Sequence, residues 1–248
     1  MRSSNPALSE KTFSTLARQG GGMTIAGTVQ KCFVLVLILL ASAAWSWSQA
    51  FPGGWSAGQM PSMPAWYLPM IIGNLVLTIV IIFKKSTAPF LTPLYAVTEG
   101  LTLGALSAIF EARYPGIVFQ AVLSTIGVFV ALLAAYQSGL IRATENFKLG
   151  VVAATGGIAL VYLIDFGMNF FGMQVPYLHE NGVIGIGISV FVVAVAALNL
   201  VLDFDFIEQG AEAGAPKYME WYAAFGLLVT LVWLYLEILR LIAKMSKK

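Results

Sequence analysis

The sequence predicts an all-α protein that crosses a membrane as a bundle of seven transmembrane helices. Of its 248 residues, 58% are hydrophobic and only 10% are charged. A soluble domain carries about 25% charged residues, so this apolar surplus is too large for one buried core and must largely face lipid. The apolar runs are long and continuous, unlike the alternating segments of about ten residues that form a transmembrane β-barrel.

Seven apolar runs each come near the roughly 20 residues that a helix needs to cross a bilayer. We expect helices at about 29–48, 66–83, 90–110, 117–136, 147–166, 183–206 and 219–242. The small residues at 153–157 favour close helix packing in the fifth of them. The chain is thus divided into an N-terminal tail at 1–28, a transmembrane domain at 29–243 and a basic C-terminal tail at 244–248.

Basic residues predict the orientation of these helices, because lysine and arginine concentrate in cytoplasmic segments. With a cytoplasmic N-terminus, Arg113 is the only basic residue in the opposite loops, and the inside segments hold Arg2, Lys11, Arg18, Lys31, Lys84, Lys85, Arg142, Lys148 and Lys217. The basic C-terminus would lie outside if all seven helices cross, or inside if one late segment is re-entrant. We favour seven crossings of the plasma membrane, since the last run has full length.

Composition and motifs exclude several classes of function. The single cysteine, Cys32, and the single histidine, His179, cannot form a cysteine or multi-histidine metal cluster. No basic stripe with interleaved aromatics supports nucleic-acid binding. The sequence lacks H-E-x-x-H, G-x-S-x-G and P-loop motifs, so we expect neither enzymatic activity nor a resident cofactor. The lipid bilayer is the one partner that the composition requires.

The strongest functional candidate is the acidic end of the sixth run, Leu202-Asp-Phe-Asp-Phe-Ile-Glu-Gln-Gly210. A carboxylate near membrane depth costs several kcal/mol unless it is paired, protonated or hydrated. Asp203 lies deepest, and Asn199 lies one helical turn before it on the same face. Asp205 points to nearly the opposite side, so at most one of the two aspartates faces the interior squarely. We therefore predict that Asp203 is the acid that takes up and releases a proton.

Other acids occur inside apolar runs. Glu99 lies in the middle of the third run between Thr98 and Thr102, where it must be hydrogen-bonded and protonated or else hydrated. Glu237 precedes Arg240 by three residues, which is the spacing of a structural ion pair near a helix end. Because calcium binds carboxylate and carbonyl oxygens, Asp203, Glu99 and Asn199 would supply ligands for transient calcium if the third and sixth helices meet.

The chain also resembles a known family. The run 202–214, Tyr218 and the closing Leu234-Tyr-Leu-Glu-Ile-Leu-Arg-Leu241 look like the Bax inhibitor-1 family in its bacterial, YccA-like branch. This resemblance implies seven helices with the last one at the centre, and a pH-sensitive calcium leak controlled by an acid on each of the last two helices. Asp203 matches the first acid, and Glu237 stands where the family has its second, an aspartate.

Two functions from different classes are consistent with these observations. The first is a pH-sensitive cation leak channel or regulator, with calcium as the implied ion, that uses Asp203 and Glu237 as partners and Asp205, Glu99 and Asn199 around them. The alternative is a membrane interaction protein that modulates a membrane protease or a stress response and transports nothing.

Overall fold

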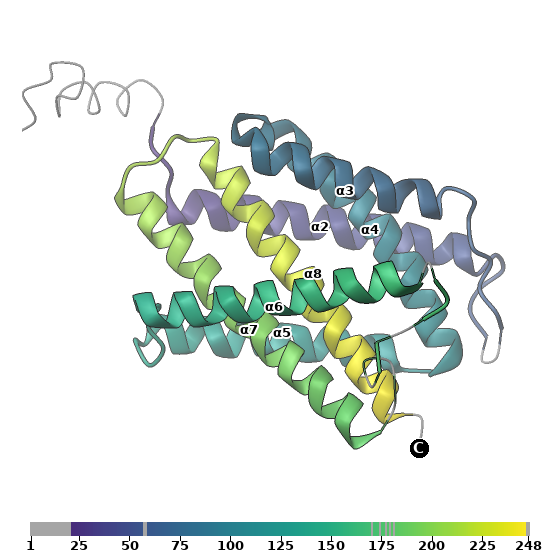
Figure 1. Ribbon diagram of the computed structural model, residues 1–248. Coiled ribbons are helices and arrows are strands. Elements are labelled where there is room, and N and C mark those ends of the chain that lie inside the picture. Colours follow the sequence, from purple (N-terminus) through teal and green to yellow (C-terminus); the bar gives the residue numbers. More distant parts are fainter. Residues whose placement is uncertain are drawn as a thin grey trace, which may run out of the picture.

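The computed structural model describes three long ranges, residues 21–56, 59–169 and 182–246. Between the second and the third range it also describes residues 171–173, 175–176, 178 and 180. Within them, seven α-helices and one 3-10 turn form a single bundle (Figure 1): α2 (Ile25–Ala50), α3 (Tyr67–Phe83), η2 (Lys85–Thr87), α4 (Ala88–Arg113), α5 (Ile117–Gln137), α6 (Glu145–Asn169), α7 (Val183–Glu212) and α8 (Met219–Met245). Six of the helices are long and apolar enough to span a membrane, and α3 is a shorter apolar helix of 17 residues. The predicted class, an all-α polytopic membrane protein, is confirmed.

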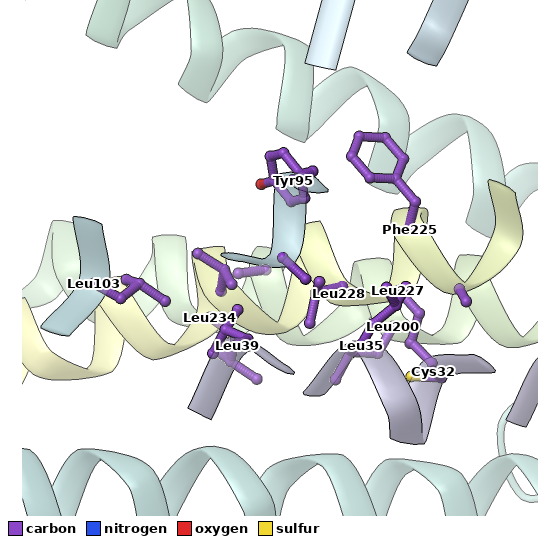
Figure 2. Packing of buried hydrophobic residues seen from close by; sticks show 14 of the residues in the cluster. Cys32, Leu35, Leu39, Tyr95, Leu103, Leu200, Phe225, Leu227, Leu228 and Leu234 are labelled. Atoms are coloured by element: carbon purple, nitrogen blue, oxygen red, sulfur yellow. The ribbon is translucent and has the colours of Figure 1, made fainter. Parts of the chain in front are cut away.

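The last helix occupies the centre of the bundle, as the resemblance implied. Helix α8 packs against α2, α4, α5 and α7, and it is buried along most of its length. In Figure 2, Leu227, Leu228 and Leu234 of α8 meet Leu35 of α2 and Leu200 of α7 in one apolar cluster. The surrounding helices need no polar outer face, because lipid replaces water around them.

The outer surface of the bundle is strongly apolar. Phe33 on α2, Phe119 on α5 and Leu163 on α6 are among the many large hydrophobic side chains that point outward. A soluble protein rarely exposes apolar patches of more than a few hundred Å². The burial pattern therefore agrees with a protein that is solvated by lipid.

The closest helix packing occurs between α2 and α4, at two glycines four residues apart. A Cβ atom on Gly100 would lie 2.3 Å from the Leu39 carbonyl oxygen, and one on Gly104 would lie 2.2 Å from that of Ala43. The expectation of tight packing at 153–157 is wrong for Gly156 and Gly157, since a Cβ on either would meet nothing within 4 Å. They lie on α6, a peripheral helix that packs mainly against α7.

Several helices extend beyond their predicted ends. Helix α2 begins at Ile25, because the Thr24 side chain caps it by accepting a 3.0 Å hydrogen bond from Gly27 N. Helix α7 continues to Glu212 and is followed by Gly214, whose φ of 62° favours glycine. Helix α8 runs to Met245, so Lys244 is a buried helical residue rather than the start of a tail. Residues 1–20, His179, Lys247 and Lys248 lie outside the described residues.

One end of the bundle, which we call the basic end, collects the starts of α2, α4, α6 and α8. The backbone there links distant segments, since Met23 N donates to the Ala215 oxygen at 2.7 Å. Lys31, Lys85, Lys148 and Lys217 belong to this end, and Figure 1 places the end of α8 on the opposite side from the start of α2. The arrangement is the one expected for seven alternating crossings.

Candidate functional site

Asp203 lies at the interface between α7 and α8, about one third of the way along α8 from the basic end. The residue is half-buried, but its Oδ2 atom is enclosed and has no hydrogen-bond partner among the described residues. It is the only carboxylate among the three side chains of that part of the chain with such an atom. Buried polar atoms are nearly always hydrogen-bonded, so an unpartnered one calls for a functional or structural explanation.

The surroundings of Asp203 are small and weakly polar. A Cβ on Gly226 of α8 would lie 3.9 Å from the Asp203 Oδ1 atom, so the α8 backbone passes close to the carboxyl group. Thr230, one turn further along α8, also interacts with Asp203, but its hydroxyl donates to the Gly226 carbonyl oxygen at 3.2 Å. The Cys32 thiol of α2 is close enough for an electrostatic interaction. Asp203 therefore faces α8 and α2, and it forms no ion pair with a cation in the described part of the chain.

Asp205 lies in a different environment from Asp203. Its Oδ2 atom forms an ion pair of 2.9 Å with Lys148 of α6 and accepts a hydrogen bond of 2.6 Å from Gln209. The two aspartates thus face α8 and α6 respectively. Asp205 therefore has a cationic partner at the basic end.

The other predicted site residues are not gathered around Asp203. Asn199 donates to Thr155 Oγ1 on α6 and to the Val195 oxygen, both at 2.8 Å. Glu99 accepts a 2.8 Å hydrogen bond from Asn74 of α3. Within the described part of the chain, neither residue shares a hydrogen bond with Asp203, so the expected oxygen cluster between the third and sixth helices does not form.

Glu99 instead belongs to a polar cluster between α3 and α4. The Asn74 amide donates to Glu99 and, at 3.3 Å, to Thr102, and it accepts from the Thr98 hydroxyl. These contacts hold two apolar helices together by hydrogen bonds, which is a common use of polar side chains in membranes.

Glu237 pairs with a cation on its own helix rather than with Asp203. It is 2% exposed, and Arg240 Nη1 lies 3.0 and 3.1 Å from its two carboxylate oxygens. The Tyr162 hydroxyl of α6 donates to Glu237 at 3.1 Å and accepts from Arg240 at 2.6 Å. Seven residues separate Thr230 from Glu237, a rise of about 10 Å along α8. The two acids are therefore at different depths.

Glu220, at the start of α8, is bound by three residues that are distant or local in the sequence: Thr24, Lys31 and Lys217. It is fully buried at the start of α8 and accepts from Lys31 at 2.5 Å, Lys217 at 2.7 Å, and the Thr24 backbone and hydroxyl at 2.9 Å. Gly27 leaves room for it, since a Cβ there would lie 2.2 Å from Glu220 Oε1. Lys217, three residues before it, was the one local signal for this pairing.

Lys244 was also missed. Its ammonium group is enclosed at the far end of the bundle, where it donates to the carbonyl oxygens of Leu178 and Gly185 at 2.8 and 3.0 Å and to the Ser189 hydroxyl at 2.8 Å. The lysine therefore ties the end of α8 to the start of α7.

No ready calcium site is present in the part of the chain that the structure describes. No group of three or more His, Cys, Asp and Glu side chains there could hold a metal ion. Calcium takes six to eight oxygen ligands, and Asp203 supplies one carboxylate with no second acid beside it. A cation at Asp203 would need water or a rearranged α7–α8 interface.

Comparison with known proteins agrees with the resemblance seen in the sequence. The family model described as Bax inhibitor 1 like matches residues 5–247. Searches of the curated proteins and of the solved structures found no significant match. Because the family model covers nearly the whole chain, the chain belongs to the Bax inhibitor-1 family. Its assignment to the YccA-like branch stays a prediction.

Proposed function

We propose that this Bax inhibitor-1 family protein is a pH-responsive cation leak in which Asp203 is the titrating group. The observation that carries the proposal is the enclosed, unpartnered Oδ2 atom of Asp203 at the α7–α8 interface. A buried polar atom without a partner costs about 1–3 kcal/mol, and the charged form of an unpaired carboxyl group costs far more. Such a group is stable in a dry interface only while it carries its proton.

Loss of that proton would change the interface. The carboxylate would need water or a cation, and the nearby Gly226 leaves the α8 backbone close to the charge. Separation of α7 from α8 would admit both. Transport and protonation are coupled in this scheme because the same oxygen atoms bind either a proton or a cation. Calcium is the ion that the family resemblance implies.

The roles of the other acids follow from their contacts. Glu237 is neutralised by Arg240 and held by Tyr162, so we assign it to anchoring α8 on α6. Asp205 is neutralised by Lys148. Asp203 therefore acts without a second titrating acid beside it, unlike the paired arrangement that the resemblance implies.

Flux measurements in proteoliposomes test the proposal. The wild-type protein should pass calcium at a rate that changes with pH. Asparagine resembles the protonated carboxyl group in shape and charge, so Asp203→Asn should show, at every pH, the flux that the wild type shows at its acidic limit. Asp205→Asn is the matched control, two residues away, and should keep the wild-type pH response.

Two results would defeat the proposal. One is a wild-type protein that passes no cation at any pH. The other is an Asp203→Asn variant whose flux still follows pH as the wild type does. Retention of the thermal unfolding transition shows that a variant is folded and keeps both results interpretable.

A further inference from the structure

A long groove runs along the outside of the bundle between α2 and α5. It has a volume of about 1460 Å³, and α8 forms its floor through Leu227, Leu231 and Tyr235. Its lining on α2 extends from Ile25 to Trp47, which is about 33 Å of helix and thus close to the thickness of a bilayer's hydrocarbon core.

The walls of the groove are apolar and not filled by the chain itself. Phe33 of α2, Ile126 and Val130 of α5 all line it, and each is more than half exposed. The occupant must therefore be apolar over most of its length.

The charged side chains of the groove lining lie at its basic end. Arg142, from the connection between α5 and α6, lines it there together with Glu208 of α7. Arg142 is exposed and forms no ion pair with any described residue. Glu208 accepts a hydrogen bond from the Tyr136 hydroxyl but likewise has no described cationic partner. The neighbouring Asp205 is already neutralised by Lys148.

This end of the groove thus offers one unpaired cation and one unpaired anion. A lipid with only a negative headgroup would satisfy Arg142 but would meet the carboxylates of Glu208 and Asp205. A quaternary ammonium has no N–H group to donate to the Glu208 carboxylate, whereas a primary ammonium has three. A phosphate and a primary ammonium on one molecule match both free charges.

We propose that the α2–α5 groove binds a zwitterionic phospholipid with a primary-ammonium headgroup, with its phosphate on Arg142, its ammonium on Glu208 and its acyl chains along α2 and α5. This site is separate from the α7–α8 interface, and it does not depend on any transport activity.

Native mass spectrometry tests the proposal on the full chain reconstituted with equal amounts of phosphatidylethanolamine, phosphatidylcholine and phosphatidylglycerol. The wild type should retain phosphatidylethanolamine in about two- to fivefold excess over each of the others, the effect expected of one exposed charge pair. Glu208→Gln, which removes the ammonium contact, should reduce the excess to near one. Arg142→Gln, which removes the phosphate contact, should lower the retention of all three lipids. Lys84→Gln and Glu212→Gln, which change exposed charges outside the groove lining, should leave the excess intact.

Several outcomes would overturn the proposal. Equal retention of the three lipids, or a preference for phosphatidylglycerol, contradicts the assigned headgroup. An unchanged preference in Glu208→Gln contradicts the ammonium contact. A second copy of the chain or another polypeptide retained in place of lipid shows that the groove has a protein occupant instead.

Discussion

Replacement of Glu220 by alanine should loosen the basic end of the bundle. The change removes an acceptor that binds Thr24 through two hydrogen bonds and Lys31 and Lys217 through one ion pair each. Lys31 is only 19% exposed, so its ammonium loses its partner in a partly buried place. Breaking a buried pair costs about 3–5 kcal/mol. Because Lys217 and part of Lys31 can reach water, we expect about 3 kcal/mol, at the lower end of this range.

This loss should be visible as a lower unfolding temperature. For a chain of this length, about 3 kcal/mol corresponds to a decrease of about 6–12 °C. Cys32, the single cysteine, is buried and can report unfolding through a thiol-reactive dye. The control is Glu145→Ala, which removes a carboxylate that is 90% exposed and pairs with Lys148. It should shift the transition by no more than about 2 °C.

The reasoning is refuted if Glu220→Ala unfolds within about 2 °C of the wild type. That result would mean that the connection between Thr24, Lys31 and α8 contributes nothing measurable. A double variant with Lys31→Ala adds a second check. Because the two residues interact directly, their effects should be clearly less than additive.

Three further predictions follow from the packing. Gly104→Ala should destabilise the protein by about 1–3 kcal/mol through overpacking at the α2–α4 contact. Gly157→Ala, which faces open space, should be neutral or stabilise the protein by up to about 1 kcal/mol. If dye-monitored melting ranks the two variants in the reverse order, the α2–α4 contact is contradicted. Arg240→Gln leaves the buried Glu237 without its cation and should lower the free energy of unfolding by about 3 kcal/mol. Glu237→Gln should lower it by about 1 kcal/mol, and dye-monitored melting measures both losses. An alkaline phosphatase fused after Lys248 should be active, since seven alternating crossings place the C-terminus opposite a cytoplasmic N-terminus; activity of a cytoplasmic reporter at that position would disprove this topology.

The sequence predicted the fold well because lipid solvation imposes a simple rule. Each crossing needs a long apolar run, and such runs are visible without knowledge of their neighbours. The acids inside those runs were equally visible, and Asp203 was identified as the deeper, inward-facing aspartate of its pair. The spacing of Glu237 and Arg240 also indicated the ion pair that the structure contains.

The partners of the remaining site residues could not be predicted, because they depend on which helices are neighbours. Glu220 binds Lys31 across 189 positions, and Lys244 binds Gly185 across 59. No local pattern indicates either contact. The glycines show the same limit, since Gly100 and Gly104 lie at a close helix contact while Gly156 and Gly157 do not. Small residues permit close packing, but only the tertiary arrangement determines where it occurs.

The central claim is that Asp203 exchanges its proton when the protein changes its conductance. Infrared difference spectroscopy of reconstituted wild type and Asp203→Asn measures this directly, because the carbonyl band of a protonated aspartic acid is absent from the variant. The account predicts that this band changes over the same pH range as calcium flux. An Asp203 whose protonation stays constant while flux changes would contradict it.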